Sequence, residues 1–321
     1  MTWDVVPAIR SSSARNPRNR ATAASPTRLR GMARRSQVHI GVSGWRYKPW
    51  RRQFYPEGLP QKDELVHLAS VFSTVEINGT FYSMQTPDAF ARWADETPEG
   101  FVFAVKGPRF LTHMKRLRDP EAPLANFMAS GLLRLGPKLG PVLWQLPPNF
   151  QFDPERLEAF FELLPRDTEQ AVRLGRRHDH RLKSRAWLRV ESRRPIRHAI
   201  EIRHESFRDP AFIALLRKHR IALVCADTVE WPLLMDLTAD FVYCRLHGAS
   251  ELYRSAYSAA ELSRWAKRVR AWRDGRPMTD GTFAGPPLKR RQRRDVYVYF
   301  DNTDKLHAPQ DARALMQKLE R

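Results

Sequence analysis

The stretch 72–82, FSTVEINGTFY, contains acidic and amide side chains where a buried strand would end. Glu76 and Asn78 alternate with Val75 and Ile77, and this period of two is typical of a strand whose two faces meet different surroundings. A carboxylate and an amide in such a place are costly to desolvate. Two interpretations therefore remain open, a satisfied structural hydrogen-bond network or a functional site.

The same pattern recurs at the ends of other predicted strands. Apolar residues on one parity are expected to face helices, and polar residues on the other parity are expected to face the axis or mouth of a barrel. Buried charges must be paired or functional, so their regular placement favours a binding or catalytic pocket. The residues on this second parity are Ser43, Glu76, Asn78, Lys106, Gln145, Glu201, Arg203, Asp227, Arg245, His247 and Asp301.

These residue types suit acid–base chemistry on a small polar substrate. Glu76 and Glu201 are predicted as acid and base. Asp227 and His247 complete the predicted catalytic set, while the cations Lys106, Arg203 and Arg245 are expected to hold an anionic substrate. A carboxylate pair also suits glycoside chemistry. The acids with His204 and His247 suggest a divalent metal as an alternative, but the cations on the same rim argue against it, so no metal ligand is predicted. The sequence specifies no cofactor.

The elements that would position these side chains alternate along the chain. Strands are predicted at 37–43, 74–78, 101–106, 141–146, 198–203, 221–227, 240–247 and 296–300. Helices are predicted at 65–72, 87–93, 124–135, 153–164, 210–219, 259–273 and 308–319, with Asp153-Pro154 as a cap and first-turn proline. Residues 166–197 form an Arg- and His-rich segment, interpreted as a solvated insertion. Eight such units fit a single-domain (β/α)8 TIM barrel. A doubly wound sheet is the alternative, weakened because no Gly-rich loop follows the first strand.

Composition narrows the class of protein further. The 321-residue chain has a formal charge of +20, of which +7 belongs to residues 1–36. This Arg- and Ser-rich leader is predicted to be disordered, with Met32 as an alternative start, and the barrel domain is predicted at 37–321. The charge admits nucleic acid as a partner, although this partner is not favoured. Two cysteines in apolar runs and no apolar run of about 18–20 residues indicate a cytoplasmic location and no membrane partner.

Seven ordered motifs carry a family resemblance. They are GVSGWRYKPWRRQFYP, FSTVEINGTFY, FVFAVKGPRFLTH, LWQLPPNF, EIRHESF, VYCRLHG and VYVYFDN. The chain resembles the YecE-like family, the domain of unknown function numbered seventy-two, from about Val38 to Leu319. The resemblance implies a TIM barrel and no established reaction. Its recurrent residues correspond to Glu76, Asn78, Lys106, His113, Gln145, Glu201, Arg203, His204, Arg245, His247 and Asn302.

The sequence thus predicts an enzyme, a hydrolase or an isomerase, acting on a small anionic or sugar-like substrate at the barrel mouth. Substrate-binding residues are predicted to be Asn78, Lys106, His113, Gln145, Arg203, His204, Arg245, Tyr253 and Asn302. Tyr253 is included as an aromatic that could stack on a sugar or a base. Two alternatives remain, a nucleic-acid-processing protein that reaches phosphates through 166–197 and 289–294, and a non-catalytic binding barrel.

Overall fold

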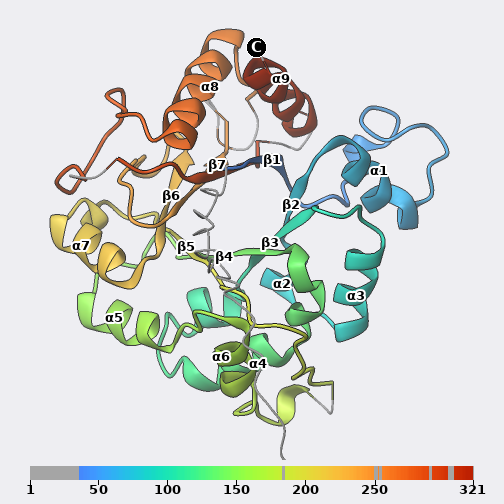
Figure 1. The fold of residues 1–321 in the computed structure, drawn as a ribbon, viewed down its shortest axis with the longest axis vertical. Helices are drawn as coiled ribbons and strands as arrows, with labels where there is room; N and C mark the ends of the chain where they lie inside the picture. The colour runs from blue at the N-terminus through green and yellow to red at the C-terminus, as the bar shows by residue number, and fades with distance from the viewer. Residues whose placement is uncertain are drawn as a thin grey trace, which may run out of the picture. The chain divides into compact units, whose positions relative to one another are not determined.

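The computed structural model describes residues 36–182, 185–248, 252, 255–288, 291–302 and 307–320. The residues from Ser36 to Arg321 form one compact unit. Within it eight parallel strands close into a barrel in the order β1 to β8, with helices outside the strands (Figure 1). The predicted (β/α)8 barrel is confirmed. Nearly all of the predicted leader, residues 1–35, and Tyr253 lie outside the described residues.

All eight predicted strands are present, with ends that differ by at most two residues from the prediction. β1 closes the barrel by pairing with β2 on one side and β8 on the other. The strands are β1 Val38–Ser43, β2 Thr74–Ile77, β3 Val102–Lys106, β4 Leu139–Gln145, β5 His198–Glu201, β6 Ala222–Asp227, β7 Phe241–Leu246 and β8 Asp295–Phe300.

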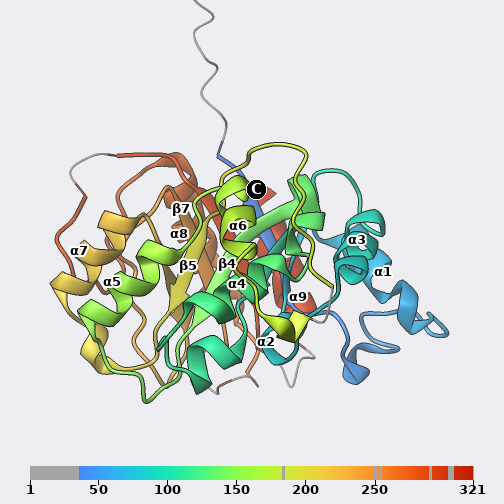
Figure 2. The same ribbon diagram turned by 90° about the horizontal axis from the view of Figure 1, so that it is seen from below.

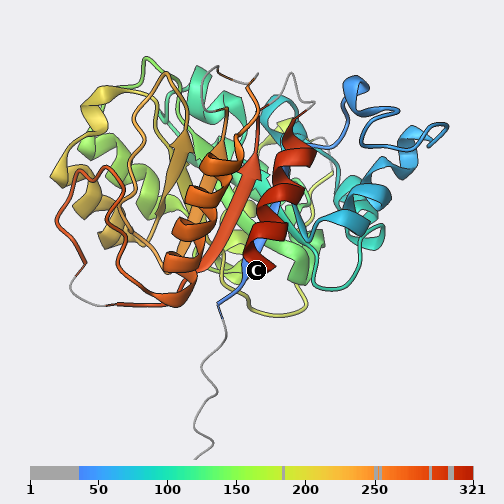
Figure 3. The same ribbon diagram turned by 90° about the horizontal axis from the view of Figure 1, so that it is seen from above.

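The α-helices surround the strands, and Figures 2 and 3 show them from two sides. In Figure 3, β8 runs between the last two helices, α8 and α9. The helices are α1 Glu64–Val71, α2 Gly79–Tyr82, α3 Pro87–Asp95, α4 Glu121–Ala129, α5 Pro154–Leu163, α6 Thr168–Gly175, α7 Pro210–His219, α8 Ala259–Asp274 and α9 Ala308–Glu320. Shorter turns occupy Lys48–Trp50, Gln61–Asp63, Phe110–Met114, Leu132–Lys138, His180–Leu182 and Glu205–Phe207.

Local sequence explains where several helices begin. The side chain of Asp153 accepts a hydrogen bond from the backbone N–H of Arg156, and Pro154 takes the first helical position of α5. A proline there loses no helical hydrogen bond, because the first N–H groups have no partner within the helix. Asp209 caps α7 in the same way, with its bond from Ala211 N–H.

Two apolar layers build the core, in agreement with the period-two prediction. The layer between strands and helices includes Val75 and Ile77, which are fully buried. The layer inside the barrel contains smaller and aromatic residues, among them Ala104, Tyr243 and Tyr299. Polar side chains on the interior parity therefore continue this inner layer toward the carboxyl ends of the strands.

The Arg-rich segment differs from the prediction of a solvated insertion. The Arg-rich segment 166–197 contains a helix, α6, capped by Asp167, and several of its arginines form ion pairs, including Arg193 with Asp167. No helix is predicted between the sixth and seventh strands, and in the described chain residues 228–240 between β6 and β7 contain no helix or strand. Thr238 in this connection accepts a hydrogen bond from Leu223 N–H and donates one to the carbonyl of Ile221.

Candidate functional site

Arg245, on β7, is the centre of a buried polar cluster at the carboxyl ends of the strands. Its side chain is 0% exposed. Its guanidinium donates to both oxygens of Glu76, to Oε2 of Glu201 at 2.6 Å and to Oδ2 of Asp301 at 2.8 Å. We call Ser43, Glu76, Glu201, Tyr243, Arg245 and Asp301 the Arg245 cluster. Four of the five N–H groups of the guanidinium donate to these carboxylates, and the nitrogen of the fifth lies 3.4 Å from Nε2 of His247, so Arg245 is directed to protein groups and not to a substrate.

Glu76, on β2, has both carboxylate oxygens occupied. Oε1 accepts from Ser43 Oγ at 2.6 Å and from Arg245, while Oε2 accepts from Tyr243 Oη at 2.6 Å and from Arg245. The side chain is fully buried. A carboxylate with four donors and no exposed surface is poorly placed to exchange protons with a substrate.

Glu201, on β5, is held in a similar way. Gln145 Nε2 and Arg203 Nε donate to its Oε1 at 2.8 and 2.9 Å, and Arg245 donates to its Oε2. Burial alone would raise the pKa of Glu201, but Arg245 and Arg203 outweigh it and hold that pKa well below its ordinary value. Glu201 is therefore an anion at neutral pH.

Lys106, at the end of β3, lies at the same end of the barrel. Its amine differs from the guanidinium of Arg245 in its contacts and in its pKa. Its Nζ is 4.2 Å from the centroid of the Phe81 ring, and the residue is 7% exposed. Among the described residues Nζ has no hydrogen bond and no ion pair within 4.0 Å. Burial, reinforced by Arg245, lowers the pKa of Lys106 to about 8.

His113 stands close to this amine and has a similarly perturbed proton affinity. Its ring meets Phe81 edge-on at 5.0 Å between centroids, and its Nδ1 is 2.9 Å from Thr112 Oγ1. Burial and the charge of Arg203 lower the pKa of His113 to about 4, so the imidazole is neutral at physiological pH. Arg203 itself lies over the Trp231 ring at 4.1 Å.

Two further predicted residues border the cluster. Asn78 donates to Ser43 Oγ at 2.7 Å, and its buried Oδ1 has no hydrogen-bond partner among the described residues. His247 is fully buried, with Nε2 3.4 Å from Arg245 and Nδ1 3.3 Å from Asp301. Trp231 packs edge-on against its ring.

The prediction that Asp227 faces the barrel axis is wrong. Its Oδ2 accepts a hydrogen bond of 2.9 Å from the indole of Trp265 on α8, in the helical layer. Asp227 follows Leu223 and Cys225 on the helix-facing parity of β6, whereas Val224 and Ala226 face the interior. Burial raises the pKa of Asp227 in this apolar setting, against the indole hydrogen bond.

Two more predicted residues make contacts away from the cluster. His204 caps the turn Glu205–Phe207, where its Nδ1 accepts from Ser206 N–H at 3.1 Å. Asn302 donates to Asp311 on α9 and to the carbonyl of Ser255. Both side chains therefore hold loops in place in the structure.

Reasoning from the sequence missed Tyr243 and gave no committed role to Phe81 or Asp301. Tyr243 stands two residues before Arg245 and four before His247, so its parity in VYCRLHG was a usable signal. Phe81 lies in the short helix α2 after Gly79, and only the packing reveals that it covers Lys106.

The donors considered for a metal do not converge. Asp227 and His204 point to other partners, as described above. Among the residues that the structure describes, no three His, Cys, Asp or Glu side chains form a group suited to a metal ion.

The described helices include none that is long and apolar enough to cross a membrane.

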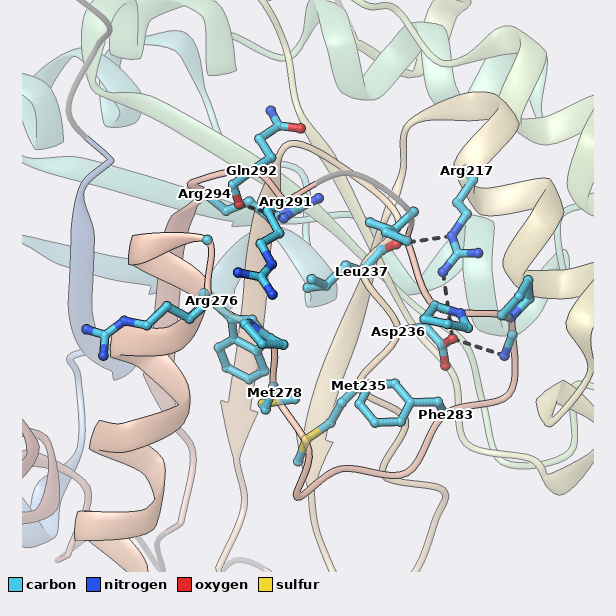
Figure 4. Close-up of a pocket in the computed structure, with 17 residues that line it drawn as sticks. Arg217, Met235, Asp236, Leu237, Arg276, Met278, Phe283, Arg291, Gln292 and Arg294 are labelled. Carbon is cyan, nitrogen blue, oxygen red and sulfur yellow. Dashed lines mark hydrogen bonds and ion pairs between the residues drawn. The ribbon is translucent and has the colours of Figure 1, made fainter.

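A separate hollow of about 530 Å³ lies at the opposite end of the barrel (Figure 4). Its lining comes from residues that precede β7 and β8, including Arg217, Met235, Asp236 and Phe283. Asp236 accepts hydrogen bonds from the N–H groups of Ala284 and Gly285, so this carboxylate is occupied. The hollow therefore offers a surface for binding and no array for proton transfer.

Comparison with known proteins gives the family. The family model described as "Protein of unknown function DUF72" matches residues 39–321. The chain belongs to the DUF72 family. The resemblance seen in the sequence motifs is thereby confirmed.

Two curated relatives are similar to part of this chain, and their names state no activity. The chain is 29% identical to UPF0759 protein YecE of Escherichia coli K12 over 127 residues, and 30% identical to UPF0759 protein YunF of Bacillus subtilis 168 over 125 residues. These alignments cover 40% and 37% of this chain and 43% of each relative.

Solved structures of the family share the fold. A DUF72 family protein from Thermotoga maritima MSB8 is 25% identical, with a TM-score of 0.64 over 89% of this chain and 100% of the other. A DUF72 family protein from Enterococcus faecalis V583 is 17% identical, with a TM-score of 0.62 over 89% and 96%.

Proposed function

We propose that this DUF72 chain is an enzyme that binds a small anionic substrate at the carboxyl-end mouth of its barrel and moves a proton on it. The observation that carries the proposal is the contrast between Lys106 and the Arg245 cluster. The carboxylates of the cluster are hydrogen-bonded within the protein, whereas the amine of Lys106 has no hydrogen bond or ion pair among the described residues.

The contacts divide the predicted residues into a positioning group and a substrate-contacting group. The positioning group consists of Glu76, Glu201 and Arg245, because their polar atoms form hydrogen bonds with one another and with other protein groups. We therefore assign them to positioning rather than to acid–base catalysis or anion binding. Lys106 and the neutral His113 form the substrate-contacting group, with an amine to hold the anion and an imidazole to relay a proton, while Arg203 is paired with Glu201.

A groove borders Phe81, the ring that lies against Lys106, although Lys106, His113 and Arg203 are not among its lining residues. Its volume is about 580 Å³, within the usual range for small-molecule sites. Arg109 and Arg181 line it together with apolar side chains such as Phe110 and Met114. An anionic group with a short apolar or sugar-like body would match such a lining.

Thermal unfolding with a panel of small phosphates and carboxylates tests the proposal. A ligand at 100 times its Kd stabilises the folded state by about 2.7 kcal/mol, which raises the melting temperature measurably. We expect such a shift for the wild type and for the control Lys115→Met, whose lysine lies on the surface beside Asp119. We expect its loss in Lys106→Met. Equal shifts in all three proteins, or none, would reject the proposal.

A further inference from the structure

We infer that Lys106 is a catalytic nucleophile, whose amine forms an imine with an aldehyde or ketone carbonyl of an anionic substrate. This inference rests on the proposed function and names its substrate class.

The backbone of Lys106 is held firmly. Its residue pairs with Leu143 across β3 and β4, and the next N–H, that of Gly107, donates to Leu143 at 2.8 Å. The carbonyl of Lys106 accepts a hydrogen bond of 2.6 Å from Thr80 Oγ1. A covalent catalyst on a rigid strand presents its reacting atom in one place, which is the condition for an efficient attack.

The amine of Lys106 has no hydrogen bond or ion pair among the described residues, and the residue is 7% exposed. No described carboxylate lies within 4.0 Å of Nζ, although Glu76, Glu201 and Asp301 are close enough to act on it electrostatically. The Phe81 ring covers one side of the amine at 4.2 Å. A lysine placed only to neutralise the cluster would donate to one of these carboxylates, and Lys106 does not.

The amine is also partly unprotonated near neutral pH, as nucleophilic attack requires. Burial and Arg245 favour the neutral form, and the carboxylates of Glu76, Glu201 and Asp301 oppose them. With a pKa of about 8, roughly a quarter of the amine is neutral at pH 7.5. The neutral fraction of a lysine of ordinary pKa would be about two hundredfold smaller.

The reaction balances without a further reagent. The nitrogen lone pair of Lys106 adds to the carbonyl carbon, and one N–H proton passes to the oxygen to give a carbinolamine. The hydroxyl then takes up one proton from solvent and leaves as water, while the nitrogen lone pair forms a protonated C=N bond to the former carbonyl carbon. The cationic imine withdraws electrons from the neighbouring carbon, so a proton on that carbon becomes easier to remove. The neutral imidazole of His113 also contacts Phe81 and is suited to relay these protons.

Borohydride trapping tests the inference on the full chain. The protein is incubated with pyruvate or with glyceraldehyde 3-phosphate, reduced with sodium borohydride, and mapped by peptide mass spectrometry. We expect one reduced adduct per chain on Lys106, at least tenfold above any other lysine. The adduct should be absent from Lys106→Met and unchanged in Lys115→Met. Adducts spread equally over surface lysines, or none with both probes, would overturn the inference.

A second measurement needs no carbonyl substrate. Methyl acetimidate modifies neutral amines, so the rate at Lys106 against pH reports both access and pKa. We expect a midpoint near 8 for Lys106, and an inert Lys106 would contradict the inference. The anion-dependent shift in melting temperature separates the two proposals, because it persists in the wild type if only the imine is wrong.

Discussion

At the scale of single residues, Arg245 determines the character of the site. One guanidinium joins carboxylates from β2, β5 and the end of β8, and each pair is shielded from water. A buried ion network of this kind is a weak source of net stability, but removing one partner leaves uncompensated charges in a medium of low dielectric. The cluster is therefore sensitive to any substitution at its centre.

Arg245→Met is expected to destabilise the protein by about 3–5 kcal/mol, because three carboxylates lose their common counter-ion. Urea unfolding measures this loss. The control is Arg208→Met, which breaks an exposed pair with Glu205 and should cost less than about 1 kcal/mol. Similar losses for the two variants would show that the Arg245 cluster is not energetically coupled.

Glu201 gives a pH-dependent prediction. Its pKa in the folded state is below the ordinary value of 4.5, so its contribution to stability is present above pH 4.5 and is lost as the pH falls below that value. Unfolding free energy measured between about pH 3 and pH 6 should therefore fall less steeply in Glu201→Gln than in the wild type. Parallel curves would mean that Glu201 is not held as an anion.

At the scale of elements, the turn after β3 positions both the amine and its surroundings. A Cβ on Gly107 would lie 2.4 Å from the ring of Trp144, which is fully buried beneath helices. Only a residue without a side chain allows β3 to end so close to this indole. The strand thus depends on a glycine for the placement of Lys106 one residue earlier.

Gly107→Ala is expected to lower stability by about 1–3 kcal/mol through overpacking against Trp144, and to slow amidination of Lys106. Gly79→Ala is the matched control, since its Cβ would meet only the flexible Gln85 side chain at 3.6 Å. That variant should change stability by no more than about 0.5 kcal/mol. A harmless Gly107→Ala would refute the close packing described here.

At the scale of the whole molecule, barrel closure brings distant segments together. Glu76 on β2 and Arg245 on β7 are 169 residues apart in sequence and are joined by hydrogen bonds across the barrel interior. The barrel unit, Ser36–Arg321, contains every described strand and helix. The stability of the barrel should therefore be independent of residues 1–35.

A chain that begins at Met32 is expected to match the full chain in unfolding free energy within about 0.5 kcal/mol. Chemical denaturation of the two proteins makes the comparison. A larger loss on truncation would show that the first residues contribute to the folded unit.

The same truncation addresses the nucleic-acid alternative. Residues 1–36 carry +7 of the total charge of +20, so any electrostatic binding of DNA or RNA should weaken and lose salt dependence without them. Fluorescence anisotropy at several salt concentrations measures both quantities. Tight, salt-dependent binding by the barrel alone would instead favour a nucleic-acid partner.

The sequence by itself determined the eight strands and the family, because period-two alternation and ordered motifs are local properties of the chain. It also located Glu76, Lys106, Glu201 and Arg245 at one end of the barrel. The side of the strand on which Asp227 lies could not be predicted, because IALVCAD is apolar on both faces and gives no alternation.

The tertiary structure alone decided which charges are neutralised. Whether Arg245 meets a substrate or three carboxylates depends on side chains from four strands, and strand closure sets those distances. It likewise decided that Lys106 lies against Phe81 instead of a carboxylate. Electrostatic pairing acts over a few ångströms between residues far apart in sequence, so no local pattern encodes it.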